Sequence, residues 1–113
     1  MLAFKYRLTK AKDFKKINRL GRSFFSSGLR VKFLANNLGL SRFAIVTSTK
    51  VSKKATKRNR VRRQLREIIR LNFAKIKPGY DVIIFVQPQL LGKSYQELEA
   101  KIFMAFNGGK LLK

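Results

Sequence analysis

Residues 50–70 read KVSKKATKRNRVRRQLREIIR, a pattern that predicts a basic loop followed by an amphipathic helix from about Ala55 to Phe73. Placed about 100° apart on a helical wheel, the side chains separate into a mainly apolar stripe and a cationic side. The stripe comprises Val61, Leu65, Ile68 and Asn72. Such a stripe docks on a sheet, so the sequence predicts a helix packed on strands with its cationic side outward.

The cationic side carries more charge than an ordinary solvated face. Ten of the 21 residues from Lys50 to Arg70 are Lys or Arg, and Glu67 alone is acidic. Like charges repel one another, and cations in the first turn of a helix oppose its dipole by roughly 0.3–1 kcal/mol each. A bound phosphate would reverse both effects, because helix N–H groups and guanidinium groups favour an anion. The cluster therefore predicts a polyanionic partner, and nucleic acid is the first candidate.

The composition of the whole chain indicates one folded, basic domain. The 113 residues carry a formal net charge of +22, yet 45% are apolar and 12% aromatic, which suffices for a core. Without Cys or His, the chain can form no disulfide, Cys/His zinc site or His acid–base pair. Its five acidic residues are scattered. We therefore predict a single nucleic-acid-binding domain over residues 1–113, with no catalytic residue and no metal ligand.

No segment is expected to enter a membrane. The longest run of strongly apolar residues is Val82–Val86, whereas a spanning helix needs about 20 such residues. The first residues, MLAFKYRLTK, lack the apolar core of a signal peptide. We expect a cytoplasmic protein with no membrane partner.

Upstream of residue 50, the pattern predicts one short helix and two or three strands. Apolar residues at helical spacing favour a helix over Thr9–Leu20. Arg22–Ala35 has the alternation of a half-buried strand, and Gly28 can bend it into two segments. Residues 36–39, Asn-Asn-Leu-Gly, favour a turn because Asn and Gly tolerate positive φ. Arg42–Ser48 is then expected to return as the second strand of a hairpin.

Downstream, Pro78-Gly79 breaks the chain, and Asp81–Gln87 is apolar enough for a strand covered on both faces. Ser94 and Glu97 have the spacing of a capping box, which opens a last helix that ends near Gly108. The order of elements is αβββαβα, or αββαβα if the first strand is unbroken. This order predicts a two-layer α/β (α+β) sandwich.

The basic helix also carries a recognisable motif. Residues 57–63, KRNRVRR, followed by Arg66-Glu67, closely resemble the "RNR" motif of the bacterial ribonuclease P protein subunit. Residues 36–48 (NNLGLSRFAIVTS) and 79–84 (GYDVII) flank the motif as they do in that family, and Asp13-Phe14 also matches. The resemblance covers nearly the whole chain. It implies a four-stranded sheet with a left-handed βαβ crossover around the RNR helix, although about 98% of such crossovers are right-handed.

The resemblance also implies a function. In this family the RNA subunit is the catalyst, and the small basic protein binds that RNA and the 5′ leader of precursor tRNA. The protein aids the endonucleolytic removal of the leader, so it counts as a component of an enzyme while carrying no catalytic group itself. The implied cofactor is Mg²⁺, which the RNA-containing holoenzyme requires and the protein alone does not bind.

Three groups of residues are candidates for these contacts. Contacts to the RNA subunit are expected from Arg58, Asn59, Arg60, Arg62, Arg63 and Arg66, whereas Arg70 at the helix end is as readily a plain surface residue. Further phosphate contacts are expected from the basic loop, at Lys50, Lys53 and Lys54. By resemblance the leader crosses the open sheet face between the first and second helices. Phe14 and Phe33 are the candidates for base stacking there, and each could equally be plain core.

Two other functions stay open at this stage. A ribosomal or architectural nucleic-acid-binding protein would have a similar composition, and only the motif in its context argues against it. A cationic protein of the membrane surface is permitted by the basic amphipathic helix, but that helix is expected to lie between strands of a sheet.

Overall fold

The computed structural model describes residues 4–26, 28–48 and 50–113. Its helices and strands confirm the order αβββαβα, with three short 3₁₀ turns besides. The α-helices and strands are α1 (Ala11–Leu20), β1 (Arg22–Ser26), β2 (Leu29–Ala35), β3 (Arg42–Val46), α2 (Ala55–Leu71), β4 (Tyr80–Val86) and α3 (Tyr95–Gly108). The 3₁₀ turns are Phe4–Tyr6, Phe73–Lys75 and Pro88–Leu90.

The four strands form one mixed sheet in the order β1-β2-β4-β3. β2 pairs antiparallel with both β1 and β4, whereas β3 pairs parallel with β4. The hairpin expected between Arg22–Ala35 and Arg42–Ser48 is therefore wrong, because β4 lies between β2 and β3. The turn at residues 36–39 reverses the chain, but the continuously apolar β4 requires cover on both faces and takes the inner position. α2 joins the parallel neighbours β3 and β4, so the expected crossover is present, and its hand stays a prediction.

The break of the first strand at Gly28 is confirmed, and it has a steric reason. Gly28 has a φ of +82°, and a Cβ added there would lie 2.7 Å from Cδ2 of Leu90. Only glycine accepts both the positive φ and this close approach. The bend lets β1 fold back on β2 as an antiparallel pair, which places β1 at the edge of the sheet.

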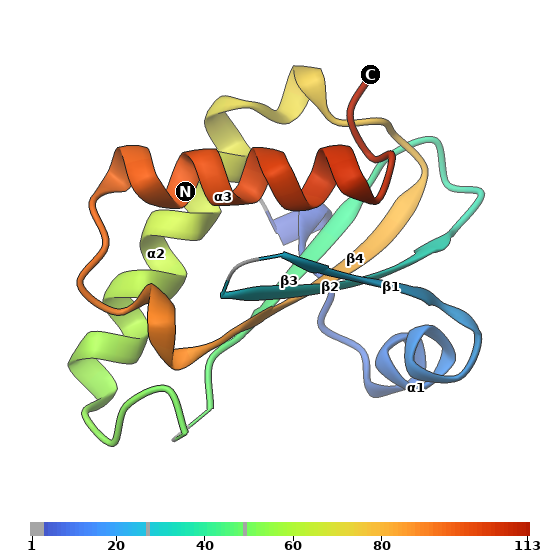
Figure 1. The fold of residues 1–113 in the computed structure, drawn as a ribbon. Helices are drawn as coiled ribbons and strands as arrows, with labels where there is room; N and C mark the ends of the chain where they lie inside the picture. Colours follow the sequence, from blue (N-terminus) through green and yellow to red (C-terminus); the bar gives the residue numbers. More distant parts are fainter. Residues whose placement is uncertain (1–3, 27, 49) are drawn as a thin grey trace.

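Helices α2 and α3 cover one face of the sheet and form the main core (Figure 1). The predicted stripe of α2 is confirmed, with Val61, Leu65 and Ile68 all buried. Its polar member, Asn72, caps the helix end by donating to the Ile68 carbonyl at 2.9 Å and to Glu99 of α3 at 3.1 Å. One polar side chain thus ends α2 and ties it to α3.

The first helix lies against the opposite face of the sheet (Figure 1). Ile17 of α1 is buried against Leu8 and against Ile83 of β4, in a second and smaller cluster. Phe14 and Phe85 are only half-buried at the margin of this cluster. α1 therefore covers part of this face and leaves the rest open, while β4 is covered on both faces as predicted.

A charged network holds α1 at its place on the sheet. Asp81 of β4 is 6% exposed and accepts two hydrogen bonds from Arg42 of β3, at 2.8 and 2.7 Å. Asn36 donates to the same carboxylate at 2.8 Å. The other guanidinium nitrogen of Arg42 lies 3.6 Å from Asp13 of α1. The hydrogen bond to Asp81 is the main reason that the pKa of Arg42 is raised.

Candidate nucleic-acid interface

The basic loop before α2 is attached to the core and to the helix, and its cations are exposed. Val51 is 4% exposed and anchors the loop in the main core. Arg58 donates from Nη1 to the Ser52 carbonyl at 2.7 Å, which ties the loop to the first turn of α2. The three lysines predicted to contact phosphates, Lys50, Lys53 and Lys54, are all exposed. The N-cap residue of α2, Lys54, makes no capping hydrogen bond with its side chain.

Four of the predicted RNA-binding residues gather on one flank of α2. A shallow cavity of about 350 Å³ is lined by Asn59, Arg62, Arg63 and Arg66. Arg62 is held in position, because it donates to Asn59 Oδ1 at 3.1 Å and to Oγ1 of Thr47 at 2.6 Å. Thr47 directly follows β3, so this hydrogen bond fixes the cationic flank to the end of the edge strand.

Arg60 faces elsewhere, which the sequence did not indicate. It lines a separate cavity of about 270 Å³, together with Lys57 and Gln64 of α2 and Lys93 of the segment before α3. The motif therefore presents two cationic surfaces, one on each flank of the helix.

Arg70 is distinguished from the motif arginines by its pairing. Its guanidinium donates to Glu67 from Nε at 3.1 Å and also from Nη2. The hydrogen bond with Arg70 is the largest cause that lowers the pKa of Glu67, so the pair carries compensating charges. The structure thus places Arg70 outside the groups of motif arginines that line the two cavities of α2.

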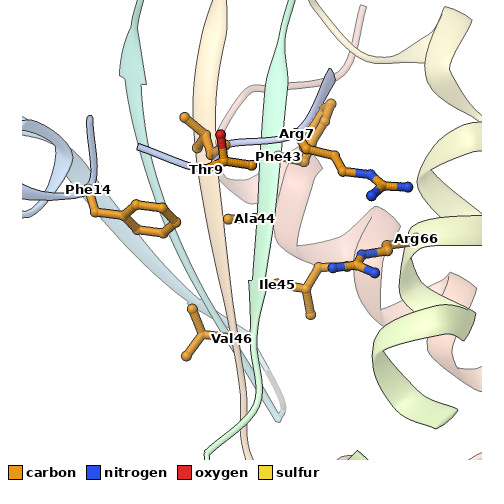
Figure 2. Close-up of a pocket in the computed structure, with 9 residues that line it drawn as sticks. Arg7, Thr9, Phe14, Phe43, Ala44, Ile45, Val46 and Arg66 are labelled. Atoms are coloured by element: carbon orange, nitrogen blue, oxygen red, sulfur yellow. The ribbon is translucent and has the colours of Figure 1, made fainter. Parts of the chain in front are cut away.

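A groove at the edge of the sheet joins α1 to α2 (Figure 2). Its cavity of about 230 Å³ is lined from both sides of strand β3. Arg7 and Arg66 lie together on the α2 side, whereas Phe14 lies on the α1 side with Ala44 and Val46 between them (Figure 2). We call this cavity the β3 groove. It places two guanidinium groups and one half-buried aromatic ring around a single surface.

Arg7 is a further candidate site residue, which the sequence did not indicate. It lies before α1, in a segment without helical or strand periodicity, where no local signal marks it. Pairing with β3 brings it to the groove: Arg7 forms a parallel bridge with Phe43, and the Leu8 N–H donates to the Phe43 carbonyl at 2.8 Å. Only the three-dimensional structure brings it beside Arg66, which lies some sixty residues later in the chain.

The electrostatics of the groove favour an anion. Burial, followed by the charges of Arg7 and Arg62, lowers the pKa of Arg66. An arginine nevertheless stays protonated near neutral pH, so three cations remain close together in a partly desolvated site. A phosphate would relieve this repulsion and accept charge-assisted hydrogen bonds from the guanidinium groups.

The two aromatic candidates for base stacking do not share a surface. Phe14 lines the β3 groove, but Phe33 is 8% exposed and packs in the core against Tyr80, with ring centroids 6.2 Å apart. Phe33 as a stacking platform is therefore wrong. Side chains alternate along a strand, and in β2 the buried Phe33 faces the helices while Lys32 and Leu34 face the side of α1.

The described residues contain neither a cluster of metal ligands nor a membrane-spanning helix. Within residues 4–26, 28–48 and 50–113, no group of three or more His, Cys, Asp or Glu side chains could hold a metal ion. In the same residues, no helix is long and apolar enough to cross a bilayer. What the site presents is cations and an aromatic ring, which are components of single-stranded RNA binding.

Comparison with known proteins agrees with this chemistry. The family model described as Ribonuclease P matches residues 2–108. The ribonuclease P protein component of Synechocystis sp. is 39% identical over 102 residues, which cover 89% of this chain and 82% of that protein. The protein component from Clostridioides difficile is 38% identical over 96 residues, or 84% of this chain and 83% of that protein.

Solved structures show the same fold. The ribonuclease P protein from Thermotoga maritima has a TM-score of 0.80 at 30% identity, over 87% of this chain and 92% of that chain. The Staphylococcus aureus protein has a TM-score of 0.85 at 23% identity, over 96% of this chain and 98% of that chain. The match of the family model over residues 2–108, with relatives of this similarity, shows that the chain belongs to the family of ribonuclease P protein components, which take part in tRNA processing with the ribonuclease P RNA.

Proposed function

We propose that the protein binds the ribonuclease P RNA through the cationic flanks of α2 and holds the 5′ leader of precursor tRNA in the β3 groove. The RNA subunit carries the cleavage chemistry. The observation that supports the proposal most is the convergence of Arg7, Arg66 and Phe14 on one groove beside the RNR helix. These residues could bind a phosphate and stack a base of a single strand that runs across the edge of the sheet.

The same residues would lower the Mg²⁺ requirement of the holoenzyme. Each lysine or arginine that neutralises a phosphate replaces a cation that the RNA would otherwise condense from solution. Mg²⁺ then serves the RNA, and this chain supplies fixed positive charge rather than metal ligands. Because precursor tRNA is the substrate, the proposal also places the protein in the cytoplasm.

The test is the affinity of the reconstituted holoenzyme for precursor tRNA and for mature tRNA without a leader. Phe14→Leu keeps an apolar contact for α1 but removes the stacking face. We expect it to weaken precursor binding by roughly 5- to 150-fold, the equivalent of about 1–3 kcal/mol for one stacked base, and to leave the affinity for mature tRNA unchanged. Phe103→Leu on α3 is the matched control, because Phe103 is also half-buried but lies away from the groove. An equal loss of affinity for precursor and mature tRNA, or no loss of affinity for either, would contradict leader binding in the groove.

A further inference from the structure

A second cationic and aromatic surface lies at the opposite edge of the same sheet face. The strand register aligns Val46 with Phe85, Phe85 with Arg30, and Arg30 with Phe25. These four residues form one row across all four strands, which begins at the β3 groove because Val46 also lines that groove. With strands about 4.8 Å apart, Phe25 lies about 14 Å from Val46 along this row.

Arg30 lies between the two aromatic rings of the row. Its guanidinium carbon is 5.5 Å from the ring centroid of Phe25 and 5.2 Å from that of Phe85, both within the range of cation–π contact. Its Nε is buried and has no hydrogen-bond partner. Among the described residues it forms no ion pair either. The two aromatic rings thus hold the Arg30 guanidinium in place, and its N–H donors remain available to bind another partner.

No packing contact in the core explains why an aromatic residue stands at position 25. Its side chain is 64% exposed, although it sits in a strand. The neighbouring Phe24 points to the other face and fills the space beside Gly108 of α3, so the core contact of β1 is made without Phe25. An exposed aromatic residue on an edge strand is a liability for aggregation unless something covers it.

We propose that Phe25 and Arg30 form a second stacking subsite for the single-stranded leader, beyond the β3 groove on the same sheet face. A base stacks on the exposed face of Phe25, and Arg30 binds the adjacent phosphate. This inference rests on the proposed function, because it extends the path of the same RNA strand. The residues between the two subsites fit such a path: Phe85 and Val46 form an apolar floor, and Lys32 of the next row adds a cation.

The charge of the surface favours RNA over a protein partner. The chain carries a net charge of +22, and the row has one large exposed apolar side chain rather than a broad apolar patch. Alternation of a ring with a cation suits the alternation of base and phosphate along a single strand. A single-stranded leader that extends from Phe14 over β4 and β2 would reach Phe25 only if it is long enough to span the sheet.

The test uses precursor tRNAs whose leaders are lengthened one nucleotide at a time and carry 2-aminopurine at a single leader position. Stacking on an aromatic ring quenches this fluorophore. With the wild-type holoenzyme, we expect one position, upstream of the nucleotides held in the β3 groove, to be quenched. Leaders that include it should also bind more tightly.

Variants at Phe25 and Arg30 isolate the proposed contacts. Phe25→Leu should abolish the quenching at that position and weaken binding of long leaders roughly 5- to 150-fold, and Phe25→Tyr should retain both. Arg30→Gln should reduce the affinity for long leaders and its salt dependence. Met104→Ala is the matched control, because Met104 is 61% exposed on α3, away from this face. All four variants should bind short leaders as the wild type does.

The outcomes separate this inference from the proposed function. If the wild type gains affinity with leader length but Phe25→Leu behaves like the wild type, the second subsite is wrong and the β3 groove still stands. If the wild type binds precursor and mature tRNA equally, the proposed leader binding itself is wrong. Equal losses in Phe25→Leu and Phe25→Tyr would also overturn the stacking role.

Discussion

At the scale of single residues, two arginines of α2 show how the neighbouring side chains decide whether a guanidinium group is available to bind a phosphate. Arg66 and Arg70 lie four positions apart on the same helix. Burial, and then the neighbouring charges of Arg7 and Arg62, lower the pKa of Arg66. Arg70 is exposed and donates two hydrogen bonds to Glu67. Both carry one positive charge, but only Arg66 is placed to gain from a phosphate.

We therefore expect Arg66→Ala and Arg70→Ala to differ in salt dependence. For binding of precursor tRNA by the holoenzyme, log K falls as log salt rises. Loss of one phosphate contact in Arg66→Ala should make this fall less steep, by about 0.7–0.9 in the slope. Arg70→Ala should leave the slope close to that of the wild type, because Glu67 already compensates its charge. Titrations over a range of KCl concentrations measure both slopes. The same change in both variants would refute the distinction.

The sequence indicates a candidate site residue where a local pattern carries the signal. The motif arginines and the lysines of the loop are visible as charge at helical spacing, and Lys50, Lys53 and Lys54 are indeed exposed. Phe33 was misassigned because alternation shows that residues face two sides, not which side is open. Arg7 lies in a segment without periodicity, and only its bridge to Phe43 of β3 brings it to the groove.

At the scale of elements, local sequence signals determine where the helices begin and end, whereas competition between strands determines the strand order of the sheet. The stripe of α2, the break at Gly28 and the capping box of α3 all follow from short-range chemistry and are confirmed. The pairing partner of β3 does not follow from short-range chemistry. A turn predicts that the chain reverses, but it does not predict which strand will pair with β3. The continuous burial from Val82 to Ile84 shows why β4 takes the inner position.

The capping box gives a prediction for stability. Ser94 Oγ accepts from the Glu97 N–H, and Glu97 accepts from the Ser94 N–H, each at 3.2 Å. Ser94→Ala should lower the free energy of unfolding by about 1 kcal/mol at pH 7, because one N–H of the first turn loses its acceptor. Urea unfolding followed by circular dichroism measures the change. An unchanged midpoint would show that water replaces the hydroxyl without cost.

The carboxylate of the box adds a dependence on pH. The backbone hydrogen bond from Ser94 is the largest cause that lowers the pKa of Glu97 below its ordinary value of 4.5. A depressed carboxyl pKa stabilises the fold above the unfolded pKa, and this contribution is lost as the pH falls through the lower folded value. The stability advantage of the wild type over Glu97→Gln should therefore be present at pH 7, begin to decrease near the ordinary pKa of 4.5 and be lost as the pH falls through the lower folded pKa. An advantage that persists at lower pH would contradict this origin.

At the scale of the whole molecule, a net charge of +22 on 113 residues opposes folding by self-repulsion. Ligands that bind only the folded state stabilise it by mass action. We expect the melting temperature to rise with inorganic phosphate or sulfate more than with chloride at equal ionic strength, because the polyvalent anions can bind the sites on α2 and in the β3 groove. Equal shifts in all three salts would indicate simple screening instead.

We propose that this chain is an RNA-binding component that supplies position and charge while the RNA supplies the chemistry. The most direct measurement is cleavage of a precursor tRNA by the cognate ribonuclease P RNA at low Mg²⁺, with and without the protein. We predict that the protein restores cleavage at the correct 5′ site and that the protein alone cleaves nothing. Tight RNA binding without any stimulation, or cleavage by the protein alone, would contradict the account.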